Sequence, residues 1–213
     1  MKMSDNSRQE ILNRIAAVRP KRVAAVDIQT LDNDGIYKPI QPDAISCFKS
    51  ELEAINGLCI LCENEKEITL KLKGFLDSKG LTTIFCRDSA IARLLSDAKI
   101  PHTDKSEDFE TMKVGITGCE FLVARTGSVL VSSASESGRQ MNVFPPIHLV
   151  VAHSNQLVDY LTDALAALQK KYGNELPSSI STITGPSRTA DIEKTLVLGA
   201  HGPKEFVVFL SNI

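Results

Sequence analysis

The chain has 213 residues, which is enough for one α/β domain with a substantial core and too few for two. Its 24 Lys and Arg residues nearly balance 26 Asp and Glu residues, and no block of five like charges occurs, so no electrostatic footprint for nucleic acid is present. There is no Trp to provide a stacking platform and no apolar run near the roughly 18 residues of a membrane-spanning helix.

These exclusions predict a cytoplasmic protein that binds no nucleic acid and has no membrane span. The polar start of the chain lacks the apolar segment of a secretory signal, which agrees with that location. We expect one domain over residues 1–213. Positions 1–42 would form an N-terminal helix and a long loop, and positions 43–213 the α/β core.

The first half of the chain alternates helices with short apolar strands. Ser7 and Glu10 have capping-box spacing and predict a helix that ends near Pro20. Residues 21–42 read as a long loop, either a lid or a loosely packed arm. Apolar periodicity and capping residues then predict helices at 44–55, 64–80 and 88–95, strands at 58–62 and 82–86, and an irregular stretch at 100–112.

From position 113 the strands follow one another closely. Residues 121–124 and 128–132 read as a hairpin, and 147–151 as a central strand entered through a Pro-Pro pair. Leu157, Leu161, Leu165 and Leu168 predict the longest helix, closed by Gly173. The β-α-β order favours a three-layer α/β/α fold whose sheet is mostly parallel, with the hairpin as an insertion.

The five cysteines are odd in number, and several lie in apolar segments, which is typical of buried thiols. Cys59 and Cys62 form a C-x-x-C without a second pair, so we predict no metal site. An iron–sulfur cluster needs about four clustered thiolates, and the dinucleotide, Walker A and zinc-protease motifs are absent, so no cofactor is expected.

The stretch 179–196 carries the predicted site. Residues 179–183 suit a strand, and Ile192 and Leu196 share a helical face, so the turn between them predicts a helix start that binds a small anionic ligand. An ordinary capped turn is the alternative. The candidate ligand-binding residues in this turn are Gly185, Ser187, Arg188, Thr189 and Asp191.

Two further loops complete the candidate ligand-binding set. His201 and Gly202 precede a last strand at 205–210, and we expect their loop to meet the first one at a sheet edge. Thr126, Gly127 and Ser128 supply two hydroxyls and a glycine, either for a ligand or for a plain hairpin turn. Arg139 follows a serine-rich loop and is either solvated or an anion clamp. No catalytic residue is assigned.

The segments 185–193 and 199–203, with the upstream 124–129, resemble the LUD domain of lactate utilization protein C. The resemblance is dense from about Val114 to Leu210. It implies an α/β fold related to the NagB/RpiA/CoA transferase-like group and to 5-formyltetrahydrofolate cyclo-ligase. Relatives often have an acidic residue immediately before the Thr-Gly pair, where this chain has Arg125, so no carboxylate role carries over to that position.

The resemblance also implies a function in the oxidation of L-lactate to pyruvate. The chain would be an accessory or ligand-binding subunit, and its partners would be the iron–sulfur protein subunits of a lactate oxidation complex. The wider fold group implies an alternative, a stand-alone ligase, isomerase or transferase that acts on a small phosphorylated or carboxylated metabolite.

Overall fold

The computed structural model describes residues 5–17, 39–192 and 195–212, and it divides the chain into two units, Met1–Pro39 and Ile40–Ile213. In the first unit the described element is helix α1 (Asp5–Ala17), which confirms the predicted N-terminal helix. It begins before Ser7, so Ser7 lies in the first turn. The predicted loop at 21–42 lies outside the described residues up to position 38.

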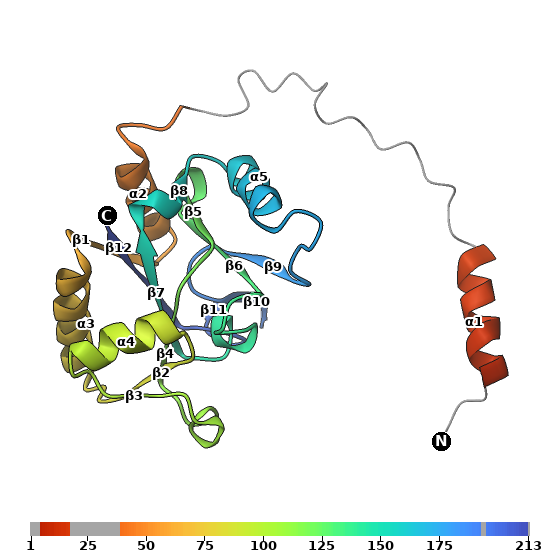
Figure 1. The fold of residues 1–213 in the computed structure, drawn as a ribbon, viewed down its shortest axis with the longest axis horizontal. Coiled ribbons are helices and arrows are strands. Elements are labelled where there is room, and N and C mark those ends of the chain that lie inside the picture. The colour runs from red at the N-terminus through yellow and green to blue at the C-terminus, as the bar shows by residue number, and fades with distance from the viewer. Residues whose placement is uncertain (1–4, 18–38, 193–194, 213) are drawn as a thin grey trace. The chain divides into compact units, whose positions relative to one another are not determined.

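The second unit is built on a six-stranded sheet whose neighbouring strands are all parallel (Figure 1). The strands, in their order across the sheet, are β1 (Leu58–Cys62), β12 (Glu205–Ser211), β7 (Ile147–His153), β4 (Val114–Thr117), β2 (Ile84–Cys86) and β3 (His102–Thr103). The apolar run of β7 lies at the centre, as predicted. Such continuous runs are typical of strands that are buried on both faces.

One face of this sheet is covered by α3 (Glu65–Lys79) and α4 (Ser89–Asp97). The side chains of Asn64 and Asp88 accept hydrogen bonds from the first free backbone N–H groups of these helices, and Gly80 ends α3 with a left-handed φ of 64°. All three caps were predicted from sequence. The short 3₁₀ helix η2 (Ser106–Asp108) lies in the irregular stretch beyond α4.

The opposite face is covered by α2 (Ala44–Ala54) and by a second, four-stranded sheet. Its strands are β8 (Leu157–Val158), β5 (Phe121–Val123), β6 (Ser128–Ser132) and β9 (Ile180–Ile183), and α5 (Leu161–Tyr172) packs on its outer side. The 3₁₀ helices η3 (Ala124–Thr126), η4 (Gln140–Asn142) and η5 (Ser154–Gln156) connect these elements. The mixed α/β fold with a mostly parallel sheet is therefore confirmed, and the predicted hairpin is the centre of a second sheet.

The prediction for the longest helix was wrong in two respects. Leu157 lies in β8, where it pairs with Leu122, and α5 begins only at Leu161. The longest described helix is α3, with 15 residues. Gly173 does end α5, as predicted. Leu157 has the spacing of the α5 leucines because β8 and α5 both contribute apolar side chains to the core. The spacing alone therefore does not show where the helix begins.

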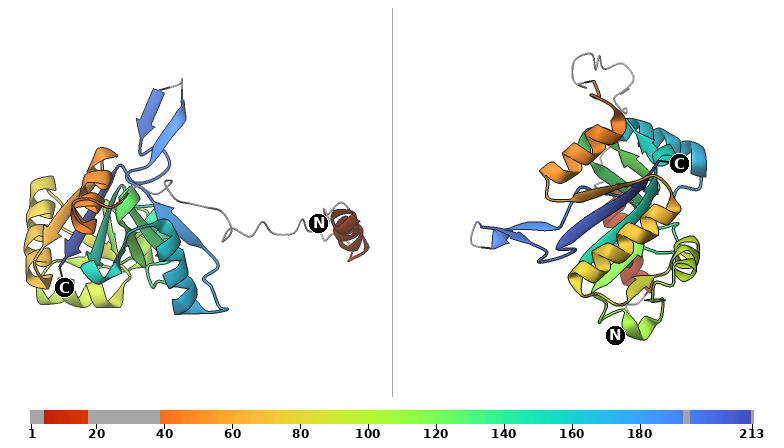
Figure 2. Two further views of the ribbon diagram at one scale, coloured as in Figure 1. Left: turned by 90° about the horizontal axis from the view of Figure 1, so that it is seen from above. Right: turned by 90° about the vertical axis from the view of Figure 1, so that its left-hand side faces the viewer.

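The helix predicted to contain Ile192 and Leu196 is not found in the described residues of this segment, which form a separate antiparallel hairpin. It consists of β10 (Arg188–Ile192) and β11 (Thr195–Leu198), with a register shift between Thr189 and Ile192. Figure 2 shows that the hairpin extends away from the two larger sheets. The β-branched residues of this segment favour extended backbone, and that preference outweighed the two apolar residues at helical spacing.

Candidate functional site

The two predicted loops meet at one edge of the parallel sheet. The backbone N–H of Ser187 donates to the Pro203 carbonyl at 2.9 Å, and that of Gly199 donates to the Ser187 carbonyl at 2.8 Å. Pro203 precedes β12, and the Lys204 N–H donates to Pro146, just before β7. The loops therefore lie at the amino ends of the parallel strands. The helix whose start was predicted to bind the anion does not form among the described residues, where β10 and β11 lie instead.

Three predicted site residues, Gly127, Gly185 and Arg188, lie against the C-terminal half of α2 together with Arg125. We call these four residues and the neighbouring Ser128 the α2 clasp. A methyl group added at Gly127 would lie 2.2 Å from the backbone nitrogen of Leu52, so only glycine permits this approach. One added at Gly185 would lie 3.1 Å from the carbonyl oxygen of Ile55.

The polar groups of the α2 clasp are bound by the chain itself. Arg125 forms an ion pair with Glu51 at 3.1 Å, and the Ser128 hydroxyl is 2.8 Å from that of Thr184. Arg188 donates a hydrogen bond to the carbonyl of Ile55, the C-cap of α2. A guanidinium at this position satisfies an end carbonyl and complements the negative end of the helix dipole. Arg188, which was predicted to bind an anion, is thus bound to a backbone carbonyl of the protein.

The remaining predicted residues of this stretch lie in the hairpin or beside it. Thr189 pairs with Val197, and Thr126 is exposed at the end of η3. The Asp191 side chain lies outside the described part of the chain. None of these residues is brought to the loop that contains His201.

His201 and Gly202 line a surface hollow of about 400 Å³, which we call the 199–204 hollow. Its lining residues are Val143, Phe144, Pro146, Gly199, Ala200, His201, Gly202 and Lys204. No carboxylate belongs to this lining. The adjacent carboxylate, Glu205, forms an ion pair with Lys79 at 2.8 Å, and no ion pair to Lys204 occurs within the described residues. The hollow therefore combines an ammonium, an imidazole and an aromatic wall, which suits a small anion.

The backbone of the 199–204 hollow adds further donors. Within the described residues, the amide groups of Ala200, His201 and Gly202 donate no backbone hydrogen bond. Gly199 has a φ of 70°, and the Lys204 side chain packs over it, since an added methyl would lie 2.1 Å from Lys204 Cγ. Consecutive amides next to a left-handed residue are typical of backbone anion sites. Sequence reasoning missed Lys204, although its position between a Gly-Pro pair and a strand was the available signal.

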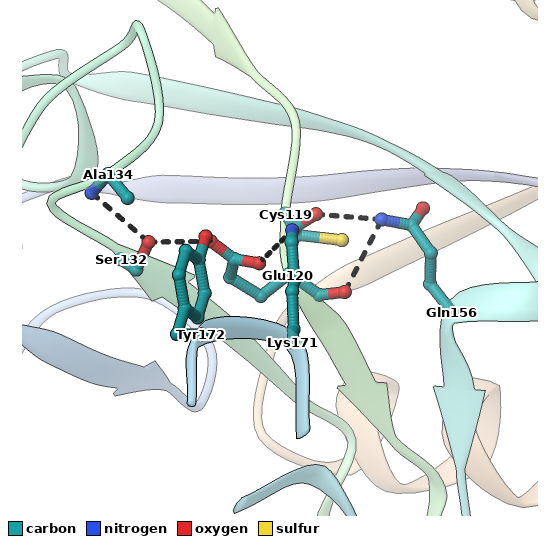
Figure 3. A network of polar contacts seen from close by, with 7 residues as sticks. All are labelled: Cys119, Glu120, Ser132, Ala134, Gln156, Lys171 and Tyr172. Carbon is teal, nitrogen blue, oxygen red and sulfur yellow. Dashed lines mark hydrogen bonds and ion pairs between the residues drawn. The ribbon is translucent and has the colours of Figure 1, made fainter. Parts of the chain in front are cut away.

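A buried carboxylate lies at the other edge of the sheet, in the connection from β4 to β5 (Figure 3). Glu120 accepts hydrogen bonds from Ser132 Oγ at 2.5 Å and from Lys171 Nζ and Tyr172 OH at 2.7 Å. Burial alone would raise the pKa of Glu120, but these donors outweigh it and lower the pKa below the ordinary value of 4.5. Glu120 is therefore a structural anchor for β6 and α5 rather than a general acid.

His148 is fully buried in β7 and contacts Phe206 edge-on. Its Nε2 lies 2.9 Å from Thr117 Oγ1, whereas Nδ1 has no hydrogen-bond partner among the described residues. Burial lowers the pKa of His148 to about 3, so the ring is neutral near pH 7. His148 is therefore a core residue whose hydrogen bonding is satisfied at one ring nitrogen among the described residues.

The cysteines are poorly placed for a shared metal ion. Cys59 packs in the cluster under α2, and Cys62 packs in the cluster under α3 and α4, so the two thiols lie on opposite faces of the parallel sheet. Burial raises the pKa of Cys59 to about 12, which keeps its sulfur protonated. Across residues 5–17, 39–192 and 195–212, no group of three His, Cys, Asp or Glu side chains is arranged to hold a metal ion.

None of the helices in the described ranges is both long enough and apolar enough to cross a bilayer.

The fold and the hollow define a mixed α/β protein with a small polar site at the amino edge of a parallel sheet. Residues 45–211 match the LUD domain, so the chain belongs to the LUD domain family. The expected resemblance is confirmed.

Two of the curated relatives match part of this chain. The chain is 33% identical over 121 residues to an uncharacterized protein of Neisseria meningitidis serogroup B, an alignment that covers 57% of this chain and 51% of that protein. It is 36% identical over 106 residues to lactate utilization protein C of Bacillus subtilis, covering 47% of this chain and 44% of that protein. The matched stretches thus span about half or less of these relatives.

A solved structure shares the fold. The DUF162 family protein from Deinococcus radiodurans superposes with a TM-score of 0.61 at 14% sequence identity, over 82% of this chain and 99% of that chain. At this identity the likeness shows the fold alone. A ribose 5-phosphate isomerase A from Methanocaldococcus jannaschii reaches a TM-score of only 0.31, which carries no argument about fold or function.

Proposed function

We propose that this LUD-domain protein is an accessory or ligand-binding subunit of a cytoplasmic iron–sulfur system that oxidises L-lactate to pyruvate. The observation that carries the proposal is the 33–38% identity to relatives that include lactate utilization protein C. The LUD domain match covers residues 45–211, which include the predicted loops.

The 199–204 hollow is the proposed site for a small anionic ligand. Lys204 supplies a charge without an ion pair among the described residues, and three amides of the lining donate no backbone hydrogen bond there. Charge-assisted hydrogen bonds of this kind are the stronger ones in proteins. In this proposal Gly185, Ser187 and Arg188 act indirectly, since they hold the hairpin and its loop in place.

The proposed partners are the subunits that carry iron–sulfur clusters. A cluster requires about four converging thiolates, whereas Cys59 and Cys62 lie on opposite faces of the sheet and Cys59 is protonated. This donor set does not fit a cluster, so the proposal places electron transfer in other chains.

Affinity purification of the chain from its native cells tests the proposal. We expect co-purifying iron–sulfur proteins and lactate-dependent reduction of a dye by the complex. If the isolated chain instead converts a phosphorylated or carboxylated metabolite by itself, the alternative of a stand-alone ligase, isomerase or transferase replaces this proposal.

A direct prediction follows for the isolated chain. It should be colourless and inactive on lactate alone, because its thiols do not converge and it has no dinucleotide motif to accept electrons. Visible absorption and assays for iron and acid-labile sulfide on a freshly purified sample check this. Stoichiometric iron and sulfide would contradict it.

A further inference from the structure

A second hollow lies between the edge of the small sheet and the loop that carries η4. It measures about 340 Å³. We call it the serine hollow, and its lining residues are Val131, Ser132, Ser133, Arg139, Asn142, Val143, Ser179, Ser181, Thr182 and Ile183. No predicted site residue belongs to it, and Arg139 was left open between a solvated residue and an anion clamp.

Strand pairing decides which of these side chains share the inner face. Val131 pairs with Ser181 and Val129 pairs with Ile183, and paired residues present their side chains on the same face. Val129, Val131 and Ile183 pack in the cluster between the two sheets, so Ser181 faces the same side. Ser132 lies on the opposite face, where its hydroxyl binds Glu120.

The strand pairing continues one step beyond β6. The Ser133 N–H donates to the Ser179 carbonyl at 2.9 Å, and the Ser179 N–H donates to Ser133 Oγ at 3.1 Å. By the two-residue period of a strand, Ser133 and Ser179 share the face of Ser181. Within the described residues, the hydroxyls of Ser179 and Ser181 make no hydrogen bond. The inner face therefore offers free hydroxyls beside the aliphatic side chains of Val131 and Ile183.

One ionisable side chain lines the serine hollow. Arg139 Nη2 donates to Ser178 Oγ at 2.5 Å, which positions the guanidinium and leaves its other N–H groups available. No carboxylate belongs to the lining, and the Asn142 amide donates to the Gly138 carbonyl at 3.4 Å. A single fixed guanidinium matches a monovalent oxyanion, and its fork suits a carboxylate.

We infer that the serine hollow binds a short 2-hydroxy carboxylate, with the carboxylate on Arg139, the hydroxyl on Ser179 or Ser181, and the short carbon chain against Val131 and Ile183. L-Lactate is such an acid, so the inference deepens the proposed function and rests on it for which acid is bound. The site itself follows from the lining. It is separate from the 199–204 hollow, with which it shares only Val143 as a wall.

The test titrates the full chain with L-lactate in a calorimeter and repeats the titration with variants. Arg139→Gln removes the charge and should weaken binding about 10-fold or more, because a charge-assisted contact is lost. Ser181→Leu fills the hollow from an exposed edge strand and should abolish binding while the protein stays folded. Arg8→Gln, on the exposed surface of α1, is the matched control and should bind like wild type.

A further titration identifies the ligand chemistry. Propionate lacks the hydroxyl and should bind about 2- to 10-fold more weakly than L-lactate. Equal affinities of wild type and Arg139→Gln, unchanged binding by Ser181→Leu, or no binding of lactate by folded wild type would each overturn the inference.

These outcomes are independent of the fate of the proposed function. Lactate binding that depends on Arg139, without any co-purifying iron–sulfur protein, would leave the site intact and refute the accessory-subunit role. Co-purification of iron–sulfur proteins, together with a lactate affinity that does not depend on Arg139, would support the accessory-subunit role and refute the site.

Discussion

The α2 clasp and the 199–204 hollow both belong to the segments that resemble the LUD domain, but they use their polar groups in opposite ways. In the clasp, Arg188 binds the Ile55 carbonyl, Arg125 binds Glu51, and Gly127 touches the backbone of Leu52. In the hollow, Lys204 and three amides have no such partner within the described residues. Residues of one motif thus divide into a group that stabilises the fold and a group that remains available to a ligand.

The strongest way to test this division is to break the clasp at Gly127. Gly127→Ala should lower the free energy of unfolding by about 3 kcal/mol or more, because the residue has a φ of 58° and the new methyl would meet the Leu52 backbone at 2.2 Å. Urea unfolding of both proteins measures the change.

Gly80→Ala is the matched control for this experiment. Gly80 has a φ of 64°, but an added methyl would meet no atom within 4 Å. It should therefore cost only about 1 kcal/mol, the price of the left-handed conformation alone. Equal losses for the two variants would show that the contact with α2 contributes nothing.

The free energy of unfolding should also depend on pH, because the buried His148 stays neutral in the folded protein. Its pKa is about 3 when folded and 6.5 ordinarily, so between these values the unfolded chain binds one proton more than the native protein. Stability should therefore fall as pH decreases below about 6.5, by up to ~1.4 kcal/mol per pH unit from this residue.

A window above pH 4.5 isolates this effect from the carboxylates. Glu120, Glu67 and Glu136 have lowered pKa values, so their contributions are present above about 4.5 and are lost only below it. Unfolding free energies of wild type and His148→Gln, measured from pH 4.5 to 6.5, give the two slopes. Parallel slopes would mean that His148 is not the group responsible.

Sequence patterns predicted the parallel sheet and the caps of the helices that pack on it, because these features depend on residues close together in the sequence. Asn64, Gly80 and Asp88 act on backbone groups within a few residues, and the apolar run of β7 reports burial on both faces. The hairpin β10–β11 was missed for the same reason. Its segment carried both a weak helical spacing and β-branched residues, and local preference alone did not rank them correctly.

The candidate site was less accessible to sequence reasoning than the fold. The partner of Arg188 is a carbonyl 133 positions earlier in the chain, and no local pattern encodes that contact. By contrast, the loop of His201 was predicted just before the last strand, and it does precede β12 at the amino edge of the sheet. The serine hollow joins segments around positions 133, 139 and 181, which the pairing of β6 with β9 and the Arg139–Ser178 hydrogen bond bring together.

Arg188→Ala tests the clasp at its exposed margin. Because the guanidinium binds the C-cap carbonyl of α2, its loss should lower the free energy of unfolding by about 1 kcal/mol and leave the affinity for small anions unchanged. Melting curves and anion titrations run on the same samples separate the two effects. Weaker anion binding by Arg188→Ala, with an unchanged melting curve, would contradict this expectation and show that Arg188 binds the ligand, as predicted from the sequence.

The smallest expected change in stability belongs to Lys204, on the other side of the comparison. Lys204→Gln keeps the aliphatic stem that packs over Gly199 but removes the charge, and the ammonium has no ion pair among the described residues. The free energy of unfolding should therefore change by less than about 0.5 kcal/mol. Affinity for an anion in the 199–204 hollow should fall by about 10-fold, since one charge-assisted contact is lost. Lys99→Gln, an exposed lysine between α4 and β3, serves as the control in the same titration with inorganic phosphate. If both lysine variants bind phosphate as wild type does, the free charge of Lys204 has no ligand role.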